Sequence, residues 1–398
     1  MSEWIITTVG KLGKVVTGKT PSKNNPEDWG NEYLFITPSD YGNYNKSANH
    51  SIRGLSEEGY KRHKVRMIPK HSCLVTCIGS DMGKVVMNAE DAFCNQQINA
   101  LIPNTSIIDS DYAYYFFKDS ALILKTLGSD GTAVPILNKS DFEKIELSIP
   151  PLPEQKAIAS VLSSLDDKID LLHRQNKTLE AMAETLFRQW FIEEAKEDWE
   201  EKTLEHVISH FIDYRGKTPN KTTSGIPLIT AKIVKDGRIQ APTEFISEED
   251  YPLWMTRGYP EINDVVLTTE APLGEIGLIR DTKVALAQRI ITLRCDPEQF
   301  DNVLLKYYLM SEVGQYELDS RASGTTVFGI KASVLKKLSL AIPPLEEQRE
   351  IAQRLHTIED KMYANEQQAR ILAQLRDTLL PKLMSGEVRV QVKQESAA

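Results

Sequence analysis

The chain contains one long stretch of sequence twice. Residues 149–165 read IPPLPEQKAIASVLSSL, and residues 342–358, 193 positions later, read IPPLEEQREIAQRLHTI. A period of this length is far longer than that of solenoid repeats, so it indicates two duplicated domains instead of an array. Each copy opens an apolar periodic segment typical of a long helix. We therefore expect two globular units, each followed by a rod.

Shorter motifs recur in the same order, at offsets between 191 and 198 positions. They include Trp4 and Trp199, GKTP at 18–21 and 216–219, Gln-x-Ile at 96–98 and 288–290, and Gly-Thr at 131–132 and 324–325. Between them, short β-rich runs alternate with turns, and one helix is expected near 112–127 with a counterpart near 303–318. The sequence predicts two similar α+β domains, each with a mixed or antiparallel sheet.

The two rods carry apolar residues at alternating steps of four and three, which is a heptad seam. The seams run from Ile158 to Trp190 and from Ile351 to Leu383, with an interruption at Arg376. Asn176 and Asn365 fall within the seams, where polar residues fix register at some cost in stability. Pro381 is expected to end or kink the second rod. Rods of this length measure roughly 50 to 60 Å.

A narrow apolar seam is unstable alone in water, so each rod needs a partner. An antiparallel pair of coiled-coil helices, with the domains related by a pseudo-twofold axis, is the natural arrangement within one chain. The alternative is that each rod packs only onto its own domain. The expected boundaries are a first domain at 1–150, a spacer helix at 151–195, a second domain at 196–343, a second spacer helix at 344–385 and a tail at 386–398.

Composition limits the possible classes of protein. No apolar run is long enough to cross a membrane and no export signal begins the chain, so the cytoplasm is the expected compartment. The four cysteines are too few for a disulfide framework or a thiolate zinc site. A net charge of -9 argues against nonspecific adhesion to nucleic acid, although the acidity is concentrated in the first spacer helix.

Several patterns are similar to catalytic or metal-binding motifs but lack a feature that those motifs need. Residues 13–20 read GKVVTGKT and match the P-loop pattern, but Pro21 follows where a phosphate-binding helix is needed. His206 and His210 lack a third metal ligand. Asp264, Asp281 and Lys283 match a nuclease-like spacing that chance also produces. The sequence therefore predicts no catalytic residues, no metal site and no cofactor.

The whole order of motifs, given twice, resembles the DNA-specificity (S) subunit of type I restriction-modification systems. LFRQWF at 186–191 and LMSGEVRV at 383–390 are similar to that family's helix endings. The resemblance implies two target-recognition domains that read a bipartite, asymmetric target in double-stranded DNA. It also implies partners, namely two modification (methyltransferase) subunits and restriction (motor-nuclease) subunits. A non-enzymatic scaffold, with two protein-binding domains and no DNA readout, is the alternative hypothesis.

Contacts to phosphates and base edges need basic or hydroxyl-bearing side chains on loops. Lys61, Arg62, Lys64 and Arg66 form the densest basic stretch of the first half, although such a cluster is more often a solvated surface. The GKTP and Gly-Thr motifs have the alternative interpretation of structural turns. The full set of predicted DNA-binding residues is Lys19, Ser39, Tyr41, Lys61, Arg62, Lys64, Arg66, Lys84, Lys139, Lys217, Lys232, Lys235, Arg238, Arg257, Arg289 and Lys331.

Overall fold

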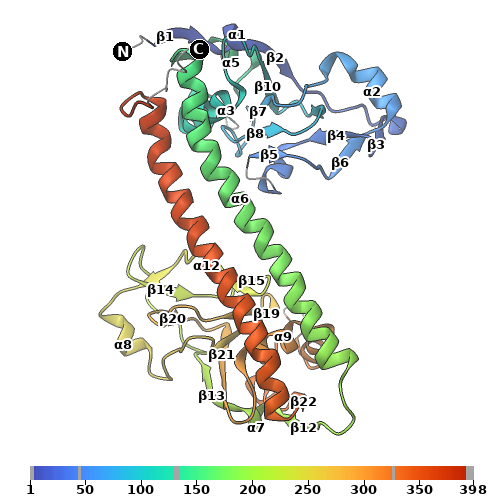
Figure 1. Cartoon of the computed structure of the whole chain (residues 1–398), viewed down its shortest axis with the longest axis vertical. Coiled ribbons are helices and arrows are strands. Elements are labelled where there is room, and N and C mark those ends of the chain that lie inside the picture. The colour runs from blue at the N-terminus through green and yellow to red at the C-terminus, as the bar shows by residue number, and fades with distance from the viewer. Residues whose placement is uncertain (1–3, 44–45, 129–134, 325–327, 391–398) are drawn as a thin grey trace, which may run out of the picture. The chain divides into compact units, whose positions relative to one another are not determined.

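The computed structural model describes residues 4–43, 46–128, 135–324 and 328–390, so Gly131, Thr132 and Thr325 of the Gly-Thr motifs lie outside the described residues. The chain divides into two compact units. Unit 1 comprises Met1–His173 with Gln367–Ala398, and unit 2 comprises Arg174–Glu366. Each unit contains one globular domain and a part of both long helices, α6 (Leu152–Arg188) and α12 (Leu345–Met384) (Figure 1).

The domain of unit 1 is a mixed α+β fold, as predicted. A central sheet has the strand order β2-β10-β7-β8-β5, and a smaller sheet has the order β3-β6-β4-β9, in which β4 and β9 are parallel. Strands β1 and β11 form an antiparallel pair beside α6. The bounds are β1 Ile5–Thr8, β2 Gly13–Thr17, β3 Trp29–Gly30, β4 Tyr33–Ile36, β5 Ser47–Ala48, β6 Arg53–Leu55, β7 Cys73–Thr76, β8 Val85–Asn88, β9 Ala92–Cys94, β10 Ile98–Pro103 and β11 Glu146–Ile149.

The domain of unit 2 repeats this topology. Its central sheet has the order β13-β21-β18-β19, strands β14 and β20 are the parallel pair, and β12 pairs with β22. A short hairpin of β15 and β16 is added. The bounds are β12 Glu200–Thr203, β13 Ile208–Asp213, β14 Ile226–Ile229, β15 Val234–Lys235, β16 Arg238–Ile239, β17 Phe245–Ile246, β18 Val265–Thr269, β19 Leu273–Leu278, β20 Ala285–Leu286, β21 Ile290–Cys295 and β22 Ser339–Ile342.

The helix expected near 112–127 is in fact two helices, α3 (Ser110–Asp119) and α4 (Ala121–Gly128). Its counterpart is likewise divided into α9 (Asn302–Met310) and α10 (Glu312–Ser320). A serine marks each break, and the Ser311 hydroxyl accepts a hydrogen bond from Gly314 N, which caps a new helix. The remaining helices are α1 Val9–Leu12, α2 Glu57–His63, α5 Lys139–Lys144, α7 Leu204–Val207, α8 Asp250–Trp254 and α11 Ala332–Leu335.

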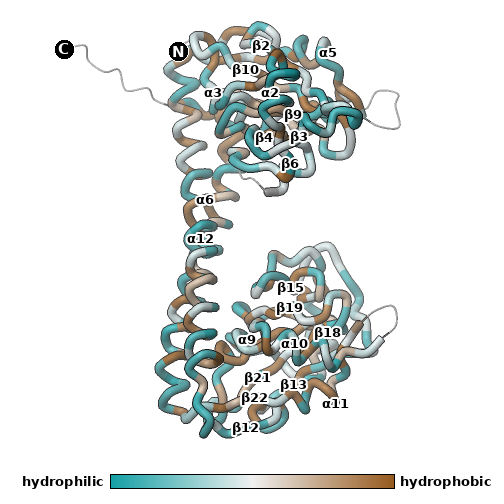
Figure 2. The backbone as a smooth tube through the Cα atoms, turned by 90° about the vertical axis from the view of Figure 1, so that its right-hand side faces the viewer, coloured by the Kyte–Doolittle hydropathy of each residue, from teal (hydrophilic) through white to brown (hydrophobic). Residues whose placement is uncertain are grey.

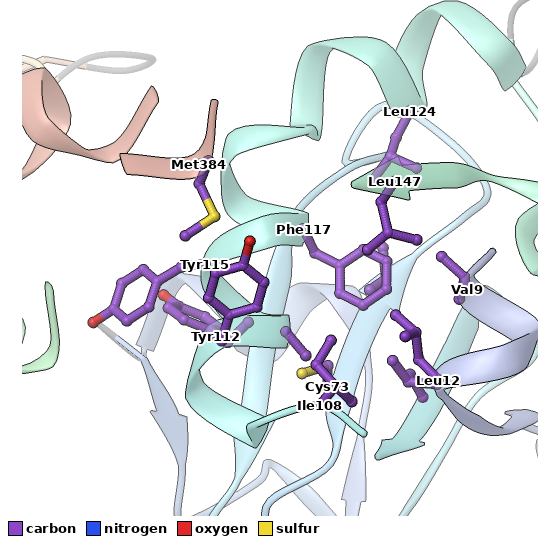
Figure 3. Packing of buried hydrophobic residues seen from close by; sticks show 14 of the residues in the cluster. Val9, Leu12, Cys73, Ile108, Tyr112, Tyr115, Phe117, Leu124, Leu147 and Met384 are labelled. Carbon is purple, nitrogen blue, oxygen red and sulfur yellow. The ribbon is translucent and has the colours of Figure 1, made fainter. Parts of the chain in front are cut away.

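The main core of unit 1 lies between its central sheet, α3 and the long helices (Figure 3). Tyr112, Tyr115 and Phe117 of α3 are buried there beside Cys73 of β7. Met384, near the end of α12, belongs to the same cluster. Burial of each such side chain contributes roughly 1.5 to 3 kcal/mol. The C-terminal part of the chain is therefore part of the core of the first domain.

The long helices pair in opposite directions within each unit, as predicted. In unit 1, Ile169 and Leu172 of α6 pack on Ala369 of α12. In unit 2, Asn365 donates to Asn176 Oδ1 at 2.8 Å. Polar and apolar residues alternate along both helices (Figure 2). The two predicted seam asparagines thus bond to each other, which penalises any shift in register.

The expectation that Pro381 ends or kinks the second rod is wrong as regards the end of the helix, because α12 continues to Met384. Pro381 lies within the last turn, and Ser385 N still donates to its carbonyl at 3.0 Å. Leu380 and Leu383, on either side of it, are buried in the core of unit 1. Their packing offsets the hydrogen bond that a proline cannot donate.

A buried carboxylate on α6 joins three elements of unit 1. Asp166, only 4% exposed, accepts from Arg376 Nη1 of α12 at 2.6 Å and from the Tyr115 hydroxyl of α3 at 2.8 Å. Lys118 Nζ lies 3.9 Å from the same carboxylate. Burial and the neighbouring Asp166 charge raise the pKa of Tyr115, so the phenol stays protonated and donates.

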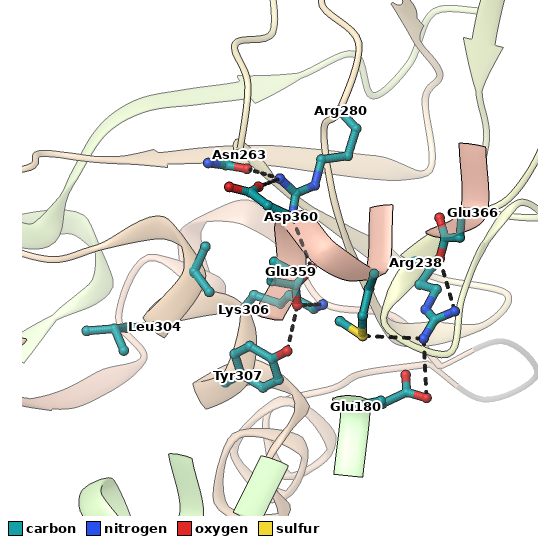
Figure 4. A network of polar contacts seen from close by, with 12 residues as sticks. Glu180, Arg238, Asn263, Arg280, Leu304, Lys306, Tyr307, Glu359, Asp360 and Glu366 are labelled. Atoms are coloured by element: carbon teal, nitrogen blue, oxygen red, sulfur yellow. Dashed lines mark hydrogen bonds and ion pairs between the residues drawn. The ribbon is translucent and has the colours of Figure 1, made fainter. Parts of the chain in front are cut away.

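The equivalent carboxylate of unit 2 is Glu359 on α12, 193 positions after Asp166. It forms an ion pair with the buried Lys306 and accepts from the Tyr307 hydroxyl at 2.6 Å, while Arg280 Nη2 lies at 3.2 Å (Figure 4). Burial alone would raise the pKa of Glu359, but the charge and hydrogen bond of Lys306 outweigh it and hold that pKa below its usual value. Asp360 shares Arg280 at 2.9 Å.

The first turn of each long helix is held by a cation from outside the helix. Glu154 of α6 pairs with Arg389, whose Nη2 lies 2.7 Å from Glu154 Oε2, and the Arg389 guanidinium lies over the Trp4 ring at 5.7 Å. Glu347 of α12 pairs with Lys196 at 2.7 Å. A carboxylate at a helix N-terminus also interacts favourably with the helix dipole.

Candidate nucleic-acid interface

The fold brings two predicted parts of the site together in unit 1. The turn at residues 18–21, here called the first GKTP turn, lies beside the basic segment that ends α2. Together they line a cavity of about 330 Å³, whose lining residues are Lys19, Ser22, Asn25, Arg62, His63, Val65 and Arg66. Lys19 and Arg66 are 47 positions apart in sequence, so tertiary folding creates this basic concavity.

Not every cation of this cavity keeps its charge free for a ligand. Arg62 pairs with the buried Asp28 at 2.7 Å and with Glu27 at 3.1 Å, and the hydrogen bond that Arg62 donates to Glu27 is the main cause of its raised pKa. In contrast, Arg66 Nη1 donates to the neutral carbonyl of Thr17 at 2.7 Å. Within the described part of the chain, Lys19 and Arg66 form no ion pair, so their charges are uncompensated.

Backbone contacts hold the first GKTP turn in place. Strand β2 ends at Thr17, opposite Asn99 of β10. Gly18 N then donates to Ile98 O at 3.1 Å and Lys19 N to Cys94 O at 2.9 Å. A Cβ atom on Gly18 would lie 2.1 Å from Asn95 O, so only glycine allows this approach. The alternative interpretation of GKTP as a structural turn is thereby supported, with the Lys19 side chain left exposed.

The second GKTP turn, residues 216–219, follows β13 in unit 2, but its backbone environment differs from that of the first turn, because a Cβ atom on Gly216 would meet nothing within 4 Å. Gly216 adopts a φ of +83°, which favours glycine, and the following Lys217 is exposed. The Arg257 guanidinium donates to the carbonyl of Asp213 at the end of β13. It also lies over the Tyr214 ring at 5.8 Å. Neither Lys217 nor Arg257 forms an ion pair among the residues that the structure describes.

The remaining predicted residues of unit 1 do not all reach this cavity. Tyr41 is only 6% exposed and its hydroxyl donates to Leu74 O at 2.9 Å, so its side chain is committed to the fold. Ser39 is exposed, with its hydroxyl 2.8 Å from Thr37 Oγ1. Three predicted lysines have acidic or aromatic neighbours on the surface, and a fourth has a carboxylate one helical turn away: Lys61 with Glu58, Lys64 with Tyr60, Lys84 with Asp81, and Lys139 with Glu143.

Three of the predicted basic residues of unit 2, Arg238, Arg289 and Lys232, have carboxylate partners. Arg238 is directed toward the long helices, 3.0 Å from Glu366 and 3.5 Å from Glu180 (Figure 4). Arg289 lies 3.1 Å from Glu270. Three predicted lysines are exposed: Lys232 on the loop after β14, 3.9 Å from Glu244, Lys235 in β15, and Lys331 at the N-cap of α11.

The structure also reveals polar residues that the sequence reasoning did not assign to the site. The Thr20 hydroxyl donates to Gln96 Oε1 at 2.7 Å, and the Thr218 hydroxyl donates to Gln288 Oε1 at 3.4 Å. Two repeated motifs, GKTP and Gln-x-Ile, therefore meet in each unit. The repetition of these two motifs in the sequence could have identified the threonine and the glutamine. A polar surface residue that occurs in both copies indicates a contact that both domains make.

Comparisons with known proteins agree with this architecture. The sequence model of the type I restriction modification DNA specificity domain matches residues 1–181 and again residues 196–375. The chain is 27% identical to the MjaIX type I restriction enzyme specificity subunit of Methanocaldococcus jannaschii, over 98% of this chain and 94% of that protein. It is 26% identical to the MjaVIII specificity subunit of the same organism, with the same shares covered.

A solved structure is similar in fold. The type I restriction-modification S subunit from M. genitalium has a TM-score of 0.61 and 19% identity, and the match covers 96% of both chains. Among the described residues, no helix is both long and apolar enough to cross a bilayer. The two segments matched by the family model make up most of the sequence. The chain therefore belongs to the family of type I restriction-modification DNA specificity proteins.

Proposed function

We propose that this protein is a non-catalytic, sequence-specific DNA-binding subunit that reads a bipartite, asymmetric target. The observation that carries the proposal is the pair of GKTP turns, each with its threonine bonded to the glutamine of the Gln-x-Ile motif and with a lysine and an arginine that form no ion pair among the described residues. Such charges supply the sequence-independent part of DNA affinity. Two similar domains account for a target in two parts.

The residues around the two turns differ, which supports an asymmetric target. Arg62 and His63 beside the first turn correspond, 191 positions later, to Leu253 and Trp254 in unit 2. Leu253 is 75% exposed, whereas its counterpart is a charged guanidinium. Because the repeated elements maintain the fold while exposed residues such as Arg62 and Leu253 differ, each domain is equipped to read different bases.

The long helices suit the spacing role in this proposal. With 37 residues in α6 and 40 in α12, a rise of 1.5 Å per residue gives lengths of about 56 and 60 Å. Reading two segments of one duplex in successive major grooves requires a separation of about 34 Å or a multiple of it. The bonded asparagine pair, Asn176 and Asn365, supports a fixed register for such a spacer.

We also propose that two modification subunits dock on this chain and that restriction subunits join through them. Exposed apolar side chains on the long helices support a protein-binding role: Val161 and Met182 of α6, and Ile371 and Leu375 of α12. The neighbouring aromatic residues stabilise the fold instead, since Phe187 is buried in the core of unit 2 and Phe191 packs against that core. Isolated protein should accordingly show no methyl transfer, cleavage or ATP hydrolysis.

Footprinting on a random-sequence library of double-stranded DNA tests the proposal. The chain is mixed with its modification subunits, and the control omits the chain. Two protected segments separated by a gap of indifferent sequence are the expected result. Absent or uniform protection, in a mixture whose subunits do assemble, would instead identify a scaffold with two protein-binding domains. Turnover by the isolated chain would contradict the non-catalytic assignment.

A further inference from the structure

The GKTP turns are fastened in both units by the same pair of side chains. Thr20 bonds to Gln96 in unit 1, and Thr218 bonds to Gln288 in unit 2. All four residues belong to motifs that are repeated along the chain. A hydrogen bond between two surface side chains adds little stability, of the order of 1 kcal/mol or less. Its repetition in both domains is therefore better explained by the position that it gives to the turn.

An arginine supports each turn from the other side. Arg66 donates to the carbonyl of Thr17, and Arg257 donates to the carbonyl of Asp213, in each case at the end of the strand that precedes the turn. A carbonyl oxygen fixes a guanidinium without neutralising it, because arginine remains charged at all physiological pH values. In unit 1 this fixed positive charge lines the same cavity as the exposed Lys19, and in unit 2 it lies at the end of the strand that precedes Lys217.

The ligand of such a site must be common to both halves of the target. If the two domains read different bases, the shared chemical group of the two half-sites is the phosphodiester backbone. Phosphate is bound in proteins by lysine as a point charge and by arginine through its planar group. In unit 1, Lys19 and Arg66 both line the cavity of about 330 Å³, which has space for a phosphate group beside two uncompensated cations.

We propose that the two GKTP turns are equivalent phosphate-binding sites, one for each half of the DNA target. Lys19 and Lys217 contact the phosphates. Thr20 with Gln96, and Thr218 with Gln288, are positioning residues that hold the turns, while Arg66 and Arg257 add fixed positive charge. This inference rests on the proposed function. It assigns to the repeated motifs a contact that fixes each domain on the duplex and carries no sequence information.

The salt dependence of DNA binding tests the role of the lysines. Dissociation constants are measured at several salt concentrations for the assembled complex, with a labelled duplex carrying the two protected segments and with a scrambled duplex. Lys19→Met and Lys217→Met should each lower the magnitude of the slope of log affinity against log salt by about 0.9, and the double variant by about 1.8. Affinity should fall by the same factor for the target and for its single-base variants.

Lys177→Met is the matched control, since Lys177 is an exposed lysine of α6 with no ion pair in the described residues. It should leave the slope unchanged. The inference is overturned if the two turn variants also leave the slope unchanged, or if either loses tenfold or more in discrimination at one base pair. The second result would make the lysine a base reader.

A double-mutant cycle tests the positioning role. Thr20→Val removes the hydroxyl that bonds to Gln96 but keeps the size of the side chain. It should reduce the slope in otherwise unchanged protein and have no further effect in the Lys19→Met variant. Additive effects would contradict the positioning role. If wild-type complex protects no bipartite sequence, the proposed function itself fails; if it does and the lysine slopes do not change, only this inference fails.

Discussion

The two units neutralise an equivalent buried carboxylate in different ways. In unit 1 the cation for Asp166 is Arg376, which comes from the opposite long helix. In unit 2 the cations for Glu359 are Lys306 and Arg280, which both come from the globular domain. The residue at the position equivalent to Arg376, 193 positions earlier, is Ala183, which is fully buried.

The difference shows that two duplicated domains can supply the cation for an equivalent buried carboxylate from different structural elements. In unit 1 a charge contributes to helix pairing, and the Arg376 interruption of the seam is the source of that charge. In unit 2 the position equivalent to Arg376 is the apolar Ala183, and the carboxylate is paired from α9, while Arg238 lies between Glu180 of α6 and Glu366 of α12 (Figure 4). Loss of the pairing partner of the carboxylate should therefore weaken the contact of α12 with α6 in unit 1 and the contact of α12 with α9 in unit 2.

The largest expected effect follows from breaking the network of unit 2. Glu359→Gln removes the partner of the buried Lys306 and should destabilise unit 2 by about 3 to 5 kcal/mol, since an unpaired buried charge is costly. Hydrogen exchange of α9 and of the first half of α12 measures this loss locally. Glu346→Gln, at an exposed position of the same helix, is the control. Protection equal to wild type in α9 would show that Lys306 does not need this carboxylate.

Arg376→Met should destabilise unit 1 by about 2 to 3 kcal/mol, because Asp166 stays buried without its direct cation. The effect is smaller than in unit 2, since Lys118 Nζ lies 3.9 Å from the Asp166 carboxylate and remains as a second cation. Hydrogen exchange should change in α3 and at the C-terminal end of α12, with α9 unaffected. Arg370→Met, an exposed residue on the same helix, should have no comparable effect. Equal losses in both units would refute the local assignment.

Removing both charges of unit 1 sharpens the comparison. The double variant Asp166→Asn, Arg376→Met should return to within about 1 kcal/mol of wild type, because replacing a buried ion pair by uncharged groups is often nearly neutral. Urea denaturation of the single and double variants gives the coupling energy between the two residues. A double variant as unstable as Arg376→Met alone would show that packing of the arginine, and not its charge, stabilises α12 there.

The smallest effect concerns pH. His356 of α12 lies 3.0 Å from Asp301 Oδ2, and this hydrogen bond raises the pKa of His356, while Asp360 and Arg280 also face it. A histidine whose folded-state pKa is raised stabilises the fold fully below its unfolded pKa, near 6.5, and loses that contribution as pH rises through the folded value. Unit 2 should therefore lose at most about 1 kcal/mol between roughly pH 6 and pH 8.

The equivalent position in unit 1 is Ser163, which does not titrate in this range and accepts from Lys46 at 2.8 Å. Chemical denaturation near pH 6 and near pH 8 measures the effect as a difference in the free energy of unfolding. His356→Gln should remove the part of that difference that is due to His356. An unchanged pH profile in His356→Gln would exclude the histidine as its source.

The parts of the fold that were predictable from sequence depend on local periodicity. The seams and the two asparagines follow from residue spacing along a helix. The break between α3 and α4 could not be predicted from residue spacing. The apolar spacing continues through Ser120, and the sequence does not distinguish a capping serine from any other polar residue. Pro381 does not end α12 at that position, because burial of Leu383 compensates for the hydrogen bond that proline cannot donate, and this burial depends on tertiary packing.

The candidate site was predictable by residue type but not by arrangement. Lys19 and Arg66 were both singled out, yet their proximity depends on the register of β2 and on the position of α2. Arg238 was singled out as a basic residue of a loop, but its guanidinium pairs with Glu180 and Glu366, which are distant in sequence. Charge pairing between distant segments cannot be inferred from local composition.

The construction of unit 1 from both ends of the chain has a consequence for biosynthesis. Residues 1–173 are synthesised before unit 2, whereas Arg376, Leu380 and Met384 are synthesised after it. All of unit 2 is available before them. The domain that is synthesised first is thus completed after the domain that follows it, because its core lacks the residues of α12 until that helix has been made.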